Sequence, residues 1–195
     1  NSVNSIRNKL NNNYGTVPFL NMHAWTNSGV TANQRSLIDF DLSVIPSNAT
    51  IQSASLLLYV DMSLNTFPGG HQQLSGSNES IINKITIDWD ESIVTWNNQP
   101  SITTLNQTTI PQSISSNQNY IIDVTSLVQD MFTDSLNSFG FFIKLINESY
   151  YRRMIFASRD NANAELHPKL SVMFSLDSIF VDCNGVINGT SLIDT

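Results

Sequence analysis

Residues 35–42 read Arg-Ser-Leu-Ile-Asp-Phe-Asp-Leu, and this stretch decides the class of fold. Ile38, Phe40 and Leu42 alternate with polar residues, which indicates a β-strand, because successive side chains of a strand point to opposite faces of a sheet. The opposite face holds Arg35, Leu37, Asp39 and Asp41. The stretch therefore predicts a strand with one packed face and one charged face.

Similar short runs recur along the chain, with Asn, Ser, Pro and Gly between them. This pattern is typical of an all-β sandwich or barrel and leaves little room for helices. The predicted strands are Pro18–Trp25, Arg35–Leu42, Ile51–Val60, Ile81–Ile87, Tyr120–Val124, Phe139–Leu145, Arg153–Ser158 and Lys169–Phe174. One exception is residues 123–133, where apolar residues follow helical spacing and Asp123 or Thr125 could cap the first turn. We expect one short helix there.

The composition favours an extracellular protein with a single main domain. The chain has 195 residues, of which 41% are hydrophobic and only 13% are charged. Uncharged polar residues, mainly Asn, Ser and Thr, must therefore form much of the surface in contact with water. A net charge of −7 argues against binding to nucleic acid or to anionic membranes. No run of eighteen apolar residues predicts a transmembrane helix. We therefore expect no nucleic-acid partner and no membrane partner.

The composition shifts after Phe174. We assign residues 1–175 to the β domain and residues 176–195 to a linker or to the start of a following repeat. The segment around Cys183 resembles the beginning of a cysteine-flanked repeat found in surface proteins of Bacteroidetes. The chain begins at Asn1 without an initiator Met, and we expect it to be a piece of a longer protein.

Three blocks, residues 34–46, 51–59 and 93–100, together resemble the DNRLRE domain family. Further matches follow in the same order up to residue 170, so the resemblance covers most of residues 1–174. It implies a jelly-roll β-sandwich of two antiparallel sheets, attached to secreted or cell-surface bacterial proteins. Some members of that family are carbohydrate-binding modules for acidic polysaccharides such as alginate.

The sequence offers little support for catalysis. His23, His71 and His167 are scattered, and the common hydrolase, metalloprotease and phosphate-loop motifs are absent from the sequence. Acidic residues do surround Trp89, but a solvated turn explains them better than a catalytic pair. Trp89 and Trp96 are expected to pack in the core. We therefore predict that the chain is not an enzyme.

Several side chains could bind an acidic sugar. An Arg side chain offers a planar fork that matches carboxylate or sulfate oxygens, and an aromatic ring matches the apolar face of a pyranose. Alternation along the strands places candidates of both kinds on sheet surfaces, where they could line one shallow groove. The predicted carbohydrate-binding residues are His23, Trp25, Arg35, Lys144, Tyr151, Arg153 and Arg159. The alternative is that these arginines form ordinary ion pairs with Asp39, Asp41 or Asp160.

No cofactor is expected to be required. Asp160, Asn163 and Glu165 lie in the loop best furnished with oxygen ligands, so a structural Ca²⁺ is conceivable there. A simple hydrophilic hairpin explains the same residues.

These observations predict a non-catalytic carbohydrate-binding module for an anionic polysaccharide, alginate-like or sulfated. Its expected partners are that polysaccharide and the catalytic or surface domains tethered to it in a secreted or cell-surface bacterial protein. The first alternative is an adhesion or spacer domain without a specific glycan. A polysaccharide lyase ranks third.

Overall fold

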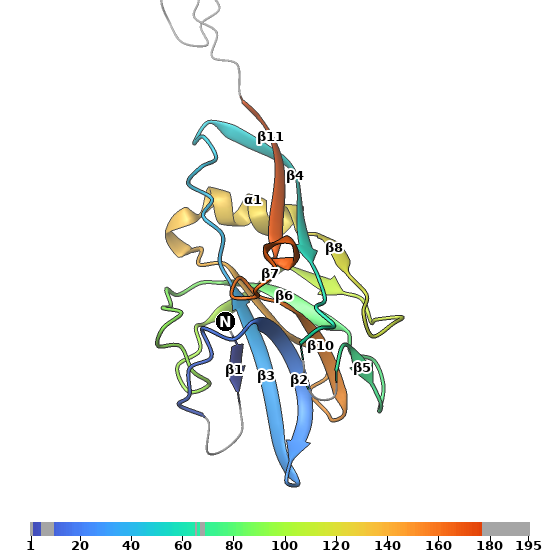
Figure 1. The fold of residues 1–195 in the computed structure, drawn as a ribbon. Coiled ribbons are helices and arrows are strands. Elements are labelled where there is room, and N and C mark those ends of the chain that lie inside the picture. Colours follow the sequence, from blue (N-terminus) through green and yellow to red (C-terminus); the bar gives the residue numbers. More distant parts are fainter. Residues whose placement is uncertain (1, 5–9, 65, 67–68, 177–195) are drawn as a thin grey trace, which may run out of the picture.

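The computed structural model describes residues 2–4, 10–64, 66 and 69–176. Two antiparallel sheets face each other, and one α-helix closes an end (Figure 1). The larger sheet has the strand order β5-β10-β2-β3-β9-β6-β7, with β1 paired to β3, and the smaller sheet has the order β11-β4-β8. The predicted all-β sandwich with one short α-helix is confirmed. Two single-turn 3₁₀ helices, η2 (Ser135–Asn137) and η3 (Ala164–Leu166), complete the described elements.

The strands of the larger sheet are β1 (Ser2–Asn4), β2 (Phe19–Asn27), β3 (Val30–Ile38), β5 (Gln72–Gln73), β6 (Ser80–Ile85), β7 (Ile102–Ile110), β9 (Phe141–Leu145) and β10 (Arg152–Ala157). Those of the smaller sheet are β4 (Ala49–Leu58), β8 (Tyr120–Asp123) and β11 (Lys169–Leu176).

The main core lies between the two sheets. Alternate residues of β2, β9 and β10 point into it from the larger sheet, and alternate residues of β4 and β8 meet them from the smaller one. Met22, Leu56, Phe141 and Met154 are all completely buried there. Each such side chain contributes about 1.5–3 kcal/mol by leaving water, so this apolar layer is the main source of stability.

Helix α1 (Thr125–Thr133) forms where helical spacing predicted it. The Asp123 carboxylate accepts hydrogen bonds from the Thr125 amide at 2.9 Å and from the Thr125 hydroxyl at 2.6 Å, so Asp123 fixes the entry to the helix. Leu127, Val128 and Met131 are buried against the main core. The helix thereby covers one end of the sandwich.

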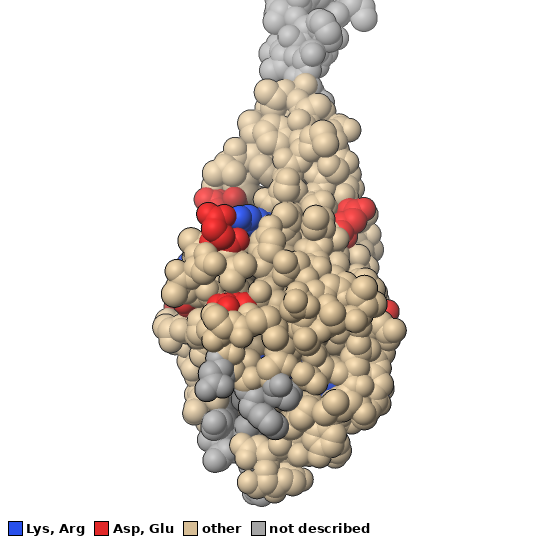
Figure 2. Space-filling view, turned by 45° about the vertical axis from the view of Figure 1, so that its right-hand side comes forward, with Lys and Arg blue, Asp and Glu red and all other residues tan. Residues whose placement is uncertain are grey.

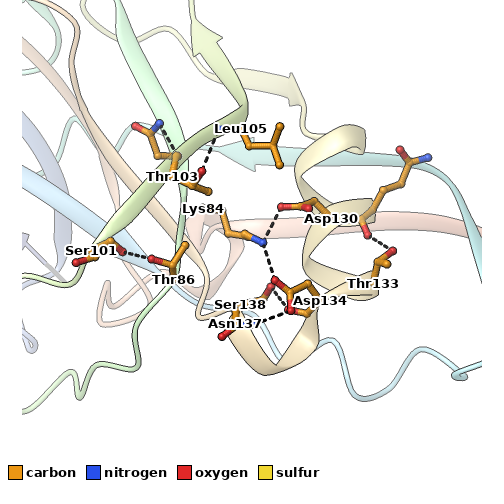
Figure 3. A network of polar contacts seen from close by, with 12 residues as sticks. Lys84, Thr86, Ser101, Thr103, Leu105, Asp130, Thr133, Asp134, Asn137 and Ser138 are labelled. Atoms are coloured by element: carbon orange, nitrogen blue, oxygen red, sulfur yellow. Dashed lines mark hydrogen bonds and ion pairs between the residues drawn. The ribbon is translucent and has the colours of Figure 1, made fainter.

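A buried lysine ties this helix to the larger sheet (Figure 3). The Lys84 ammonium on β6 lies 2.7 Å from the Asp130 carboxylate and 3.6 Å from that of Asp134, and only 5% of the Lys84 side chain is exposed. A charge this deeply buried is tolerated because it is paired.

A second hydrophobic cluster corrects the prediction of a charged face on residues 35–42. Leu37 is completely buried with Ile85, Val94 and Phe142. The loop between β6 and β7 contributes Val94 and covers this face of the larger sheet. Trp89 and Trp96, from the same loop, pack against the cluster as predicted. The sheet is therefore packed on both faces here, because a long loop folds back over it.

The predicted strand Arg35–Leu42 is wrong at its C-terminal end, because β3 ends at Ile38 and residues 39–42 lie outside it. Other strand boundaries differ from the predictions where polar residues form strands. β3 begins at Val30, earlier than predicted, because Ser28 and Gly29 both adopt positive φ angles, 51° and 79°, and close a tight hairpin with β2. β7 was not predicted at all, since most of its side chains are exposed and polar. β1 and β5 were also missed.

No helix among the described residues is long and apolar enough to cross a membrane. The predictions for residues 177–195, Cys183 included, lie outside the described residues.

Candidate functional site

Strands β2 and β10 bring four of the predicted site residues together. They pair antiparallel, with His23 directly opposite Arg153. The ring of Trp25 lies 5.4 Å from that of His23 and 4.7 Å from that of Tyr151, measured between centroids. Tyr150 adds a further ring 5.7 Å from Tyr151. We call Trp25, Tyr150 and Tyr151 the aromatic surface.

The two tyrosines are held in place from below. The Ser75 hydroxyl donates to the Tyr150 carbonyl and accepts from the Tyr151 amide. The Tyr151 hydroxyl lies 3.2 Å from that of Thr26 on β2. Tyr150 is 46% exposed and Tyr151 36%, so both rings reach solvent from a fixed backbone. A ligand would meet a largely preformed surface, which lowers the entropy cost of binding.

Two guanidinium groups follow Tyr151 on opposite faces of the sheet: Arg153 pairs with His23 on the face of Trp25, whereas Arg152 pairs with Ala24 on the core face. Arg152 donates at 2.6 Å to the carbonyls of Ser149 and Ser75, and Arg153 donates from Nε to Asn21 Oδ1 at 2.9 Å. Arg153 is only 1% exposed, and its Nη1 is buried without a hydrogen-bond partner. Within the described part of the chain, neither arginine has a carboxylate within 4 Å. This region therefore holds uncompensated positive charge inside a protein of net charge −7.

The ionisation of neighbouring groups reflects this environment. Burial, and after it the positive charge of Arg153, lower the pKa of His23 to about 3. Burial also lowers the pKa of Arg153, to about 10. At neutral pH the arginine thus remains charged while the histidine is neutral.

The other predicted cationic residues lie elsewhere. Arg35 donates from Nε and Nη2 to the Glu148 carboxylate at 2.7 and 2.8 Å, and its guanidinium lies 4.4 Å from the centre of the Trp96 ring. Arg159 is exposed and lies 2.7 Å from Glu91.

Lys144 is half-buried on β9, opposite Ile81 of β6. The predicted single groove shared by the three arginines is therefore wrong, because each has its own separate set of contacts. The alternative of ordinary ion pairs is confirmed for Arg35 and Arg159, but their partners are glutamates from distant loops and not the predicted Asp39, Asp41 or Asp160.

The oxygen-rich loop after β10 is held by hydrogen bonds of its own and by one ion pair to β11. Asn163 Oδ1 accepts the Glu165 amide at 3.1 Å and caps η3, and the Glu165 carboxylate lies 3.9 Å from the Lys169 ammonium. The Asp160 amide donates to the Ser158 hydroxyl at 3.1 Å. Over the described ranges, no group of three or more His, Cys, Asp or Glu side chains is placed to hold a metal ion.

Sequence reasoning missed Tyr150, Arg152 and Ser75. The consecutive pairs Tyr150-Tyr151 and Arg152-Arg153 were a visible signal, because each missed residue directly precedes a predicted site residue of the same type. Ser75 carried no such signal, since it comes from a loop far away in the sequence. The side of the molecule shown in Figure 2 has few charged side chains, so uncharged groups dominate what a ligand would meet there.

Comparisons with known proteins give the family. The family model of carbohydrate-binding module family 96 matches residues 4–173, which is nearly the whole described fold. A search of curated proteins found no match. Carbohydrate-binding modules are non-catalytic binding domains, in agreement with a preformed aromatic surface on a β-sandwich. The chain belongs to carbohydrate-binding module family 96.

Proposed function

We propose that this module binds an anionic polysaccharide, alginate-like or sulfated, on the aromatic surface formed by Trp25, Tyr150 and Tyr151. The observation that carries the proposal is the position of Trp25 and Tyr151 on the same face of the sheet as Arg153, which has no carboxylate within 4 Å among the described residues. Aromatic faces stack on the apolar C–H face of a pyranose ring. The rings would supply the contact, and the charge beside them would select acidic sugars.

Selection would act through the electrostatic potential and not through a direct arginine fork. Arg153 is almost completely buried, so a carboxylate on the ligand cannot reach its guanidinium without a rearrangement. A buried charge without a counter-ion is nevertheless screened weakly by water and acts over several ångströms. An anionic glycan at the surface would supply the missing negative charge.

The biological setting follows from the same proposal. We propose a non-catalytic module of the DNRLRE type, carried by a secreted or cell-surface bacterial protein and tethered to catalytic or surface domains. Such a module raises the effective concentration of its neighbours at the polysaccharide, so weak single-site binding is sufficient. No cofactor is required, and nucleic acid and membranes are not partners.

The first test compares aromatic variants in affinity electrophoresis on alginate, carrageenan, fucoidan and a neutral glucan. Trp25→Ala and Tyr151→Ala should each weaken binding to an acidic glycan by about tenfold, because each removes a stacking ring. Phe174→Ala is the matched control, since Phe174 is an aromatic residue of similar exposure, 38%, on the opposite sheet. Equal losses in all three variants would contradict the proposed surface.

The second test concerns charge. Added salt should weaken binding of the wild-type protein to the acidic glycan, and Arg153→Met should reduce this salt dependence while leaving the rings in place. A thermal melt of Arg153→Met checks that the variant folds. Salt-independent binding to neutral glucan would refute the anionic ligand but keep the aromatic surface, whereas no binding to any glycan would favour a spacer domain. Release of unsaturated products from alginate would point to a lyase instead.

A further inference from the structure

A second hollow lies at the other end of β10. This end cleft has a volume of about 420 Å³, within the range of ~300–1,000 Å³ that is common for small-molecule sites. It forms where β3 and β10 end and β11 begins, with the loop after β6 along one side. Its lining residues are Leu20, Leu37, Ile38, Asp39, Phe40, Trp89, Glu91, Ser158, Arg159, Asp160, His167 and Pro168.

The walls of the end cleft are fixed by contacts of their own. The Trp89 indole donates to the Phe139 carbonyl at 2.8 Å, and the Ser158 hydroxyl donates to the Val17 carbonyl at 2.7 Å. A ring nitrogen of His167 lies 2.8 Å from the Asn161 carbonyl, and Phe40 packs edge-on against Phe141. These contacts involve no ligand, so the end cleft is preformed.

The chemistry of the end cleft differs from that of the aromatic surface. Its accessible apolar part is formed by the half-buried rings of Phe40 and Trp89, which lie over buried aliphatic residues. Its polar part holds three carboxylates and one guanidinium, together with Ser158 and His167. That guanidinium, of Arg159, already pairs with Glu91. Burial raises the pKa of Asp39, and the negative charges of Asp41 and Asp88 raise it further. The end cleft therefore favours ligands that donate hydrogen bonds and disfavours ligands with negative charge.

We infer that the end cleft is a second binding site, which takes a neutral sugar ring through apolar contact with Trp89 and Phe40 and hydroxyl donation to Asp39, Glu91 and Asp160. A sugar without acidic groups presents donors to these carboxylates and an apolar face to the rings. Tyr151 precedes β10 and Ser158 follows it, so about 20 Å of strand separates the two sites. The module would thus hold one surface for acidic sugars and one for neutral sugars.

The three tryptophans allow a site-resolved test. Trp25 lies in the aromatic surface, Trp89 lines the end cleft, and Trp96 packs under Arg35 and belongs to neither site. The indole N–H signals of the ¹⁵N-labelled protein, assigned through Trp25→Phe and Trp96→Phe, are followed during titration with neutral laminaritriose at millimolar concentrations. The Trp89 signal should shift in a saturable manner while the Trp96 signal stays in place. A shift of the Trp25 signal would report binding at the aromatic surface and not in the end cleft. The proposed function and the second binding site can therefore fail separately.

A pair of carboxylate variants completes the test. Asp160→Asn should weaken binding at the end cleft by about tenfold, because a charged acceptor becomes a neutral one. Asp123→Asn is the matched control, since this exposed aspartate at the start of α1 lies outside the cleft lining and should leave the affinity unchanged. The inference is overturned if laminaritriose leaves the Trp89 signal unmoved or if the two variants lose affinity equally. It is also overturned if CaCl₂ moves the Trp89 signal and laminaritriose does not, since the carboxylates would then bind a cation and not a sugar.

Discussion

His23 is a histidine that the folded protein keeps neutral. Its pKa is about 3 in the fold against an ordinary value of 6.5, so between these values the unfolded chain holds one proton more than the folded chain. Stability is therefore complete above about pH 6.5 and falls as the pH drops toward 3, by up to about 1.4 kcal/mol per pH unit. Burial also lowers the pKa of His71, which acts in the same direction.

Urea unfolding at about pH 7 and about pH 5 measures this effect. The free energy of unfolding should decrease at the lower pH, and it should decrease less in His23→Gln, which has no proton to gain. An identical pH dependence in both proteins would show that His23 has the same pKa in the folded and the unfolded chain.

Part of the candidate site could be predicted from the sequence, and part could not. Alternation placed His23 and Trp25 on one side of β2, and the pairing of β2 with β10 brings Tyr151 and Arg153 to them. The partner of Arg35 could not be predicted, because it is Glu148, which lies in a loop more than a hundred positions away in the sequence. The alternation along a strand predicts on which face of the sheet a side chain lies. The ion-pair partner of that side chain depends on how loops distant in the sequence pack against it.

Between two elements of the fold, Lys84 of β6 and the carboxylates of Asp130 and Asp134 at α1 form one buried charge network (Figure 3). Variants of these residues should show whether Lys84 stabilises the fold through its ion pairs or through its packing. Replacing both Asp130 and Asp134 with Asn leaves the Lys84 ammonium buried without a counter-charge and should cost about 3–5 kcal/mol. Lys84→Met removes the charge with little change in size and should cost far less. Urea denaturation curves of the two proteins give the comparison.

Asp123→Asn is a useful control for that experiment, since it alters an exposed carboxylate at the start of the same helix and leaves the Lys84 network intact. A loss in Lys84→Met as large as in the double variant would mean that the lysine contributes through its packing and not through its pairing.

Strands were predicted best where one face of the strand is buried and the other is exposed. β4 and β8 alternate in their burial, and their predicted bounds lie within two residues of the observed ones. β7 escaped prediction because Thr, Asn and Gln occupy it, and it is a strand only because it pairs with β6. In such a strand the backbone ladder decides the conformation, and the side chains give no signal.

For the molecule as a whole, the second hydrophobic cluster should matter as much as the main core. Leu37 and Leu56 are both completely buried, one in each cluster. Leu37→Ala and Leu56→Ala should each lower the free energy of unfolding by about 2–5 kcal/mol, because each leaves a cavity. Leu136→Ala, at an 87% exposed position, is the control and should change it by about 0.5 kcal/mol or less.

Thermal and urea unfolding of the three variants provide the measurement. A small loss in Leu37→Ala alone would mean that the loop between β6 and β7 opens readily and that the second cluster is an accessory layer. The sandwich could be predicted from alternation, but this cluster could not, because it requires one long polar loop to fold back over a sheet.

The hairpin that joins β2 to β3 and the last residue of β11 lie at opposite poles of the fold (Figure 1). Trp25 is close to the hairpin, while Leu176 ends the strand at the far pole. Anchoring the protein to a sensor chip or bead through its C-terminal side would accordingly leave the tyrosine-bearing tip pointing into the medium. Coupling near the hairpin would hide it, so the two orientations should differ in capture capacity even when the same amount of protein is immobilised.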